Sequence, residues 1–139
     1  MNVNLTAMLL FSAALFVPPA GAQTWPNKPV KMVAVFPPGG SVDTVARILS
    51  FQLTKQLGQQ FIVDNKGGAS GSIGTAMVAK SAPDGYTFAV VFDTHGVNPS
   101  LIPNLPFDTM KDLAPVMIVG TSAMVIARHP TVVFKDFKD

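Results

Sequence analysis

Two glycine-rich stretches contain the residues whose types and spacing suit a chemical role. They are Pro37-Pro38-Gly39-Gly40-Ser41 and Lys66-Gly67-Gly68-Ala69-Ser70-Gly71-Ser72. Glycine adopts positive φ angles easily and lets the backbone come close to a ligand. Where such a turn leads into a helix, the free N–H groups of the first helical turn and the positive end of the helix dipole attract an anion. The pattern therefore indicates a site for a small anion.

Both stretches lack the signatures of nucleotide binding. Neither contains G-x-G-x-x-G, and neither ends in the Lys-Ser or Lys-Thr pair of a P-loop. Any single stretch of this kind is explained better by a tight turn alone. Two in succession, each with a serine before a predicted helix, make an anion site and a plain turn equally good interpretations.

Ser70 also suggests a nucleophile, which would make the protein a secreted serine hydrolase. The G-x-S-x-G pattern of a nucleophile elbow begins at Gly68 but fails, because Ser72 occupies its last position. Nothing in the spacing brings an Asp or a His to Ser70. The chain has no Cys and only two His, which are far apart. The sequence therefore predicts no metal site, no thiol catalysis and no cofactor.

Two further polar residues have two interpretations each. Asp43, in the first turn of a predicted helix, either complements the helix dipole or contacts an amine on a solute. His95 lies in a predicted polar loop and either hydrogen-bonds a ligand or is structural. His129 belongs to no motif, so we expect no role for it in binding.

Alternating strands and helices must position these residues. A Val-rich apolar run at 30–36 predicts a buried strand, and apolar residues at three- and four-residue steps predict a helix that Ser41 caps and Gly58 ends. The unit repeats with a strand at 61–65 and a short helix that Ser72 caps. Further along we expect strands at 86–92, 114–119 and 123–127, a polar loop with one helical turn at 93–101, and a helical turn at 107–113.

This alternation predicts an α/β fold with a mostly parallel sheet flanked by helices. In such sheets ligands bind beyond the carboxyl ends of the strands, which is where both glycine-rich stretches fall. The 139 residues are 48% apolar and 13% charged with a net charge of +2, as expected for one folded domain. The basic residues are scattered singly, so the sequence predicts no nucleic-acid partner.

The first residues read as a secretion signal. An uncharged apolar run at 9–17 is followed by Pro18-Pro19 and by Ala20-Gly21-Ala22, small residues that suit a signal peptidase. The run is shorter than the roughly 20 apolar residues that cross a bilayer. We therefore expect a signal peptide cleaved after Ala22 and a periplasmic protein. Residues 1–8 contain no Lys or Arg, which a start codon assigned too far downstream would explain. An N-terminal membrane anchor is the alternative interpretation of the run.

Six ordered motifs resemble the Bug, or TctC-type, family of periplasmic solute-binding proteins of tripartite tricarboxylate transporters. The resemblance extends from Trp25 to Pro130. Its motifs are W-P-x-K-P-V from Trp25, F-P-P-G-G-S-x-D-x-x-A-R from Phe36, D-N-x-x-G-A-x-G-x-I-G from Asp64, A-P-D-G-Y-T from Ala82, T-H-x-x-N-P-x-L from Thr94 and D-L-A-P-V from Asp112.

The resemblance implies a type II periplasmic-binding-protein fold, in which two α/β lobes close on a carboxylate-bearing solute. The solute is then delivered to membrane transport subunits or to a sensor domain. In the family, the first two βα loops of lobe one hold one carboxylate, partly through ordered waters, and a third loop faces the same cleft. The ligand-binding residues carried over are Phe36, Pro38, Gly39, Gly40, Ser41, Asp43, Gly68, Ala69, Ser70, Gly71, Ser72, Thr94, His95 and Asn98. The resemblance implies no catalytic residue.

The sequence departs from the family pattern in two loops and in length. Lys66-Gly67 replaces the usual Arg-Pro, and Phe92-Asp93 stands where small residues are common, so a carboxylate near the cleft would repel an anion or favour an amine-bearing solute. Family members are more than twice as long. We therefore expect a signal peptide at 1–22, part of lobe one at 23–119, and a crossover with the start of a truncated lobe two at 120–139. Impaired binding follows, with a nonfunctional gene fragment as the alternative.

Overall fold

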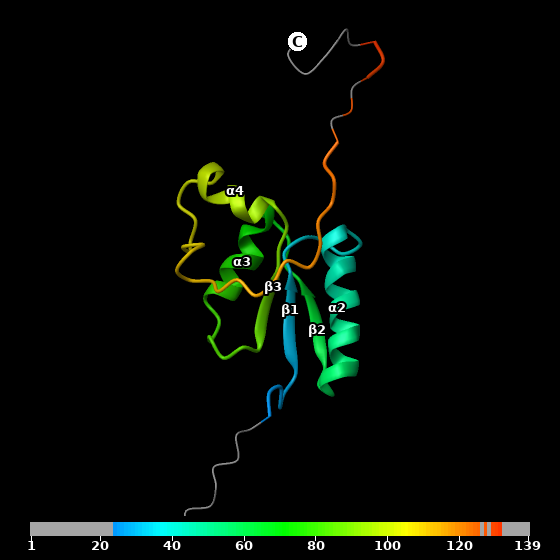
Figure 1. The fold of residues 1–139 in the computed structure, drawn as a ribbon. Coiled ribbons are helices and arrows are strands. Elements are labelled where there is room, and N and C mark those ends of the chain that lie inside the picture. Colours follow the sequence, from blue (N-terminus) through cyan, green and yellow to red (C-terminus); the bar gives the residue numbers. More distant parts are fainter. Residues whose placement is uncertain (1–23, 126, 128, 132–139) are drawn as a thin grey trace, which may run out of the picture.

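The computed structural model describes residues 24–125, 127 and 129–131, so the predicted signal peptide lies outside the described residues. Three strands form one parallel sheet in the order β2-β1-β3. They are β1 (Val30–Ala34), β2 (Phe61–Asn65) and β3 (Thr87–Val90). The prediction of an α/β fold with a parallel sheet is confirmed, and Figure 1 shows all three strands pointing toward the same edge of the molecule.

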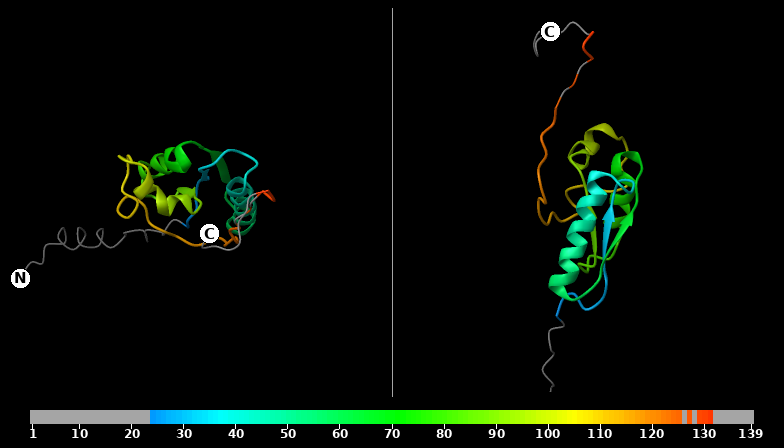
Figure 2. Two further views of the ribbon diagram at one scale, coloured as in Figure 1. Left: turned by 90° about the horizontal axis from the view of Figure 1, so that it is seen from above. Right: turned by 90° about the vertical axis from the view of Figure 1, so that its right-hand side faces the viewer.

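Helices cover both faces of this sheet. Helix α2 (Ser41–Leu57) connects β1 to β2, and helix α3 (Ser72–Ala79) connects β2 to β3 on the other side of β1. Successive side chains of β1 point to opposite faces, as the pleat of a strand requires. Met32 and Ala34 join the core beneath α2, whereas Val33 and Val35 join the core beneath α3. Figure 1 and Figure 2 show the two helices on opposite sides of the strands.

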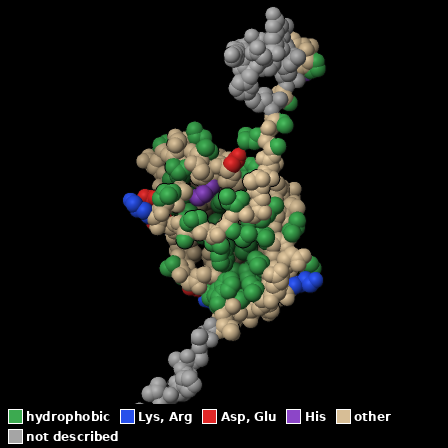
Figure 3. Space-filling view, viewed as in Figure 1, with side chains coloured by type: hydrophobic (Ala, Val, Ile, Leu, Met, Phe, Trp, Pro, Cys, Tyr) green, Lys and Arg blue, Asp and Glu red, His purple; other side chains and the backbone are tan. Residues whose placement is uncertain are grey.

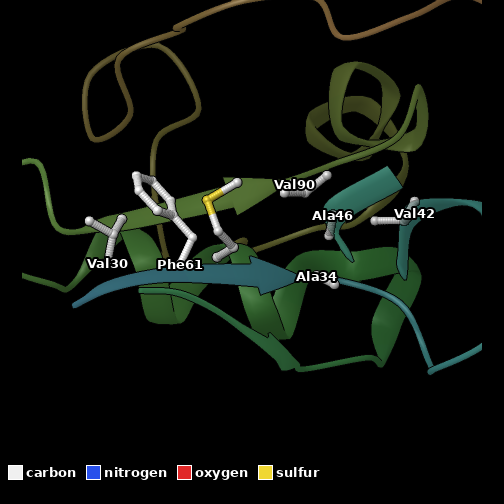
Figure 4. Close-up of a cluster of buried hydrophobic side chains, with 7 residues drawn as sticks. Val30, Ala34, Val42, Ala46, Phe61 and Val90 are labelled. Atoms are coloured by element: carbon white, nitrogen blue, oxygen red, sulfur yellow. The ribbon is translucent and has the colours of Figure 1, made fainter. Parts of the chain in front are cut away.

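The larger core lies between α2 and the sheet. Its apolar residues come from one stripe of the helix and from the facing residues of all three strands, because α2 repeats its apolar positions every three or four residues. Figure 4 shows the buried members of this cluster, which are Val30, Met32, Ala34, Val42, Ala46, Phe61 and Val90. Burial of this stripe fixes α2 against β1 and β2, and so fixes where its first turn lies.

The predicted helix over 42–57 is confirmed, and Gly58 ends it in the left-handed conformation with its N–H bonded to the carbonyl of Thr54 at 3.1 Å. The predicted caps are wrong. Gly40 and Gly71 occupy the N-cap positions, so Ser41 and Ser72 are already the first helical residues, and neither helix has a side-chain cap at its N-cap residue. The physical reason is that the chain uses each glycine to turn into the helix, one residue before the serine.

Two predictions downstream of β3 also differ from the structure. Helix α4 (Thr94–Leu101) replaces the predicted polar loop with a single helical turn, and it contains Pro99. The predicted strands at 114–119 and 123–127 are wrong, because every described residue of both is exposed and pairs with no described strand. An apolar run becomes a strand only beside a partner edge. The helical turn predicted at 107–113 is present, since the carbonyl of Asp108 accepts from the N–H groups of Lys111 and Asp112.

Large apolar side chains remain on the surface of the described chain. Figure 3 shows hydrophobic side chains gathered across the middle of the face that Figure 1 presents. The residues after position 115 contribute several exposed ones, among them Val116, Ile118, Met124 and Val125. None of the helices in the described ranges is both long enough and apolar enough to cross a membrane.

Candidate functional site

Three loops meet at the carboxyl edge of the sheet. The first loop (36–41) follows β1, the second (67–72) follows β2, and the third (94–98) lies after β3 at the start of α4. In the strand order β2-β1-β3 the order reverses between β1 and β3, so the topological switch point lies between the first and third loops, with the second loop in contact with the first. Open α/β sheets bind ligands at such points. Figure 1 shows the loops entering the upper ends of α2 and α3.

The first and second loops are in van der Waals contact. A Cβ atom built on Gly67 would lie 3.1 Å from Cδ and 3.2 Å from N of Pro37. A Cβ on Gly71 would lie 2.8 Å from Cγ2 of Val35, closer than real atoms come. The absence of a side chain at Gly67 therefore lets the two loops approach, and its absence at Gly71 lets the second loop pack on Val35, just after β1. The two glycine-rich stretches share one side of the molecule, as an anion site built from both requires.

Asp43 holds the first loop in place. Its Oδ2 accepts the N–H of Gly39 at 2.9 Å and Nε of Arg47 at 3.1 Å, and its Oδ1 accepts Nδ2 of Asn65 at 2.9 Å. The side chain is buried, with 4% of its surface exposed. The Arg47 bond, then those from Gly39 and Asn65, lower the pKa of Asp43 to about 2. Both oxygens accept hydrogen bonds within the protein, so Asp43 positions the first loop, and its contact with a solute stays a prediction.

Asn65 extends this network to the end of β2. Its Nδ2 also lies 3.2 Å from the carbonyl oxygen of Phe36, to which it donates, and its Oδ1 accepts from Nη2 of Arg47 at 3.2 Å. The first loop is thereby tied to the strand that leads into the second. Neither Asn65 nor Arg47 was expected from the sequence to have a role. The four-residue spacing of Asp43 and Arg47 on one helix was the available signal, whereas nothing local pointed to Asn65.

The second loop is a left-handed turn. Ala69, Ser70 and Gly71 have φ values of 45°, 54° and 86°, so three successive residues lie in the region that L side chains rarely adopt. Asn98, only 3% exposed, donates from Nδ2 to the carbonyl of Ser70 at 2.9 Å. Thr75 donates from Oγ1 to the carbonyl of Gly71 at 2.9 Å. Asn98 therefore binds the second loop to α4, and its amide is directed at this loop.

The remaining predicted site residues divide into exposed and covered groups. The exposed group presents backbone and hydroxyls to solvent, and it comprises Pro38, Gly39, Gly40, Ser41, Gly68, Ala69 and Ser70. Gly71 and Ser72 are buried, and Phe36 and Thr94 are half-buried. Within the described residues the hydroxyls of Ser41 and Ser70 have no hydrogen-bond partner. The first N–H groups of α2 have no intrahelical acceptor either, because all helices leave these donors free.

The histidines do not complete a catalytic arrangement. The ring of His95 stacks on that of Phe107, with centroids 6.5 Å apart and planes 14° apart, and burial lowers its pKa. His129 bonds Oγ1 of Thr131 through Nδ1 at 2.8 Å. No hydrogen bond joins either histidine to Ser70 in the part of the chain that the structure describes. The same part contains no group of three or more metal-ligating side chains.

Two surface hollows lie outside the first and second loops. One, of about 400 Å³, lies at the C-terminal end of α4 and along the segment that follows it, and its lining includes Pro99, Ile102 and Phe107. The other, of about 310 Å³, lies between α2 and β2 and includes Phe51 and Val63. In the first two loops Gly39, Gly40 and Gly68 are exposed, and the N–H of Gly39 is the one that Asp43 accepts.

Comparisons with known proteins identify the family. The model of the tripartite tricarboxylate transporter family receptor, TctC, matches residues 45–139. Protein BugT of Bordetella pertussis is 39% identical over 135 residues, which cover 92% of this chain and 41% of BugT. The chain spans 41% of BugT and 34% of a second relative, from Bordetella bronchiseptica, so these two relatives are between two and three times its length.

Solved structures agree on the fold. The periplasmic binding protein BugD is 40% identical with a TM-score of 0.61, over 63% of this chain and 29% of BugD. MatC from Rhodopseudomonas palustris, solved with bound malate, is 37% identical with a TM-score of 0.57, over 63% of this chain and 30% of MatC. These relatives are binding proteins and not enzymes. With a family model that covers most of its length, the chain belongs to the TctC family of tripartite tricarboxylate transporter receptors.

Proposed function

We propose that this chain captures a small carboxylate-bearing solute in the periplasm for a tripartite tricarboxylate-type transporter. One observation carries the proposal: two glycine turns, each leading into a helix N-terminus, lie in contact at the carboxyl edge of the sheet. Free N–H groups and helix dipoles at one place suit a carboxylate. MatC, which shares the fold, holds malate, a dicarboxylate.

The site binds an anion without a cationic side chain of its own. Arg47 is paired with Asp43, and the lowered pKa of His95 keeps its ring neutral at pH 7. Backbone donors therefore carry the binding, helped by the hydroxyls of Ser41 and Ser70. A hydrogen bond to a charged acceptor contributes about 1.5–3 kcal/mol, so a few aligned N–H groups are enough to orient one carboxylate.

The remaining parts of the proposal concern the whole receptor. Residues 23–119 would form part of lobe one, residues 120–139 would lead into a second lobe, and residues 1–22 would direct export. Closure of two lobes on a solute excludes water and supplies much of the affinity. We therefore expect binding by this chain to be weak. Its partners would be the membrane subunits of the transporter or a sensor domain.

Titration calorimetry of the chain with malate, succinate and citrate tests the proposal. We expect saturable binding of these acids and none of the matched diamine, putrescine. Ser41→Glu places a carboxylate at the first turn of α2, where it suits the helix dipole and so preserves folding, but it occupies the proposed anion site. Gln52→Glu adds the same charge at an exposed position further along α2.

Loss of malate binding in S41E, with binding kept in Q52E, would support the assignment. If S41E bound malate as well as Q52E does, the carboxylate of malate would bind elsewhere on the chain. No binding of any of the three acids by the unmodified chain would contradict the proposed function itself.

A further inference from the structure

We propose that Arg47 determines the charge selectivity of this site by neutralising Asp43, an inference that rests on the proposed function. In the first loop a negative side chain, Asp43, lies next to the proposed site for a negative solute, and Arg47 is the cation paired with it. A turn that binds a negatively charged solute has a buried carboxylate directly behind it, because Oδ2 of Asp43 lies 2.9 Å from the N of Gly39.

The Asp43 carboxylate stays ionised at neutral pH, so it keeps its negative charge beside the solute. Its hydrogen bonds from Arg47, Gly39 and Asn65 keep the pKa of Asp43 far below 7. Like charges repel strongly where water is partly excluded. An unneutralised Asp43 would therefore oppose the solute that the N–H groups attract.

Arg47 is placed to cancel that charge. Its Nε lies 3.1 Å from Oδ2 and its Nη2 lies 3.0 Å from Oδ1 of Asp43, which is the two-pronged geometry that guanidinium forms with carboxylate. The Arg47 side chain is 56% exposed, so it contributes little to the core. Its position at the outer side of α2 fits a role in balancing charge.

The other charged side chains near the first two loops belong to the Lys66–Asp64 pair and to Asp93. Nζ of Lys66 pairs with Oδ1 of Asp64 at 3.3 Å. Asp93, exposed at the start of α4, has no ion pair among the described residues. Removing the charge of Arg47 would therefore leave the surroundings of the site net negative.

Titration of malate into the wild-type chain, Arg47→Gln and Arg47→Lys, at low and at high salt, tests the inference. Glutamine can still donate one hydrogen bond to Asp43 but has no charge. We expect R47Q to bind malate about tenfold more weakly at low salt, which corresponds to about 1.4 kcal/mol. The loss should shrink at about 1 M salt, where the screening length falls to about 3 Å. R47K, which keeps the charge, should retain most of the binding.

Lys55→Gln is the matched control, because it removes the same charge from an exposed position in the last turn of α2. We expect K55Q to bind malate as the wild type does. An R47Q variant that binds like the wild type, or whose loss is the same at both salt concentrations, would overturn the inference while leaving the proposed function intact. Failure of the wild-type chain to bind malate would overturn both.

A second pair of variants decides the question if R47Q does not fold. Asp43→Asn removes the charge that Arg47 is there to cancel, so adding R47Q to D43N should not weaken malate binding further. Equal binding by D43N and by D43N/R47Q supports the inference. A further loss of fivefold or more in the double variant would show that Arg47 acts through something other than the charge of Asp43.

Discussion

The first and second loops are held in place by different physical means. The first is held by ionised groups, with Asp43 receiving donors from its own loop, its own helix and the end of β2. The second is held by neutral hydrogen bonds, from Asn98 and Thr75, to a backbone in a left-handed conformation. The difference teaches that two neighbouring glycine turns need not respond alike to acid, salt or substitution.

Conformation explains why the second loop needs its supports. Ala69 and Ser70 hold positive φ angles without being glycine, and each such residue costs about 1–2 kcal/mol. The first loop contains one residue with positive φ, which is Gly39, and glycine adopts it freely. The first loop therefore depends on charge, and the second depends on packing and on donors that offset its strain.

The largest effect should come from closing the space in the second loop. Gly71→Ala places a Cβ 2.8 Å from Cγ2 of Val35 and at a φ of 86°. Left-handed strain and overpacking together should lower the free energy of unfolding by about 2–4 kcal/mol. Urea titration measures this. Gly96→Ala is the control, since its Cβ meets no atom within 4 Å and it lies inside α4.

We expect G96A to leave stability unchanged or to raise it by up to about 1 kcal/mol, because alanine favours helix over glycine. A G71A variant as stable as the wild type would show that the backbone of the second loop relaxes easily. The contrast between the loops would then be wrong, because strain would not be what distinguishes them.

A smaller loss is expected when the neutral support is removed. Asn98→Ala leaves the carbonyl of Ser70 without its buried donor, which should cost about 1–3 kcal/mol. No ionised group takes part, so the loss should be equal at pH 3 and at pH 7. Ser100→Ala, an exposed change two residues along the same helix, is the control. A loss for N98A that varies with pH would mean that charge also holds the second loop.

The sequence predicted the regular elements well where the signal was local. The Val-rich run at 30–36 located β1, the strand predicted at 61–65 matches β2, and the apolar spacing with Gly58 located α2 and its C-terminal end. Helix α4 was underestimated because Gly96 and Pro99 both disfavour helix in isolation. Tertiary contacts outweigh them: Asn98 bonds the second loop and His95 stacks on Phe107.

The limits of sequence prediction are clearest where partners are distant. The runs at 114–119 and 123–127 have the residues of strands, but a pattern cannot say whether a partner edge is available, and in the described residues none pairs with them. The meeting of the first two loops followed from topology alone. The roles of Asp43 and Asn65 did not, because they are joined across 22 positions by side-chain directions that no local pattern shows.

Acid should separate the two loops by loosening the first. The pKa of Asp43 is lowered to about 2 in the folded chain from an ordinary value of 3.8. A lowered folded-state pKa means that the unfolded chain takes up the proton first. The contribution of Asp43 to stability is therefore complete above about pH 4 and is lost as the pH falls toward about 2.

Urea midpoints measured from pH 7 to pH 2 test this dependence. The fall below pH 4 should be shallower in Asp43→Asn than in the wild type, and as steep in N98A as in the wild type. Asp84 and Asp108, whose pKa values are also lowered, should give both variants a residual acid dependence. Identical pH profiles for D43N and the wild type would show that the charge of Asp43 does not stabilise the first loop.

The smallest effect concerns a charge that neither loop contains. Asp93 is the N-cap residue of α4, the helix that Asn98 bonds to the second loop. It is exposed, so water screens its carboxylate. Two unit charges about 10 Å apart in water repel by about 0.4 kcal/mol, which is a factor of about two in affinity. Asp93→Asn should therefore raise malate affinity about twofold at low salt, while Asp112→Asn, an exposed carboxylate further along the chain, should not. If D93N weakened the binding of an amine-bearing dicarboxylate such as aspartate while strengthening that of malate, Asp93 would discriminate between solutes. An equal change in affinity for malate and aspartate would show that Asp93 acts only through the overall charge of the surface.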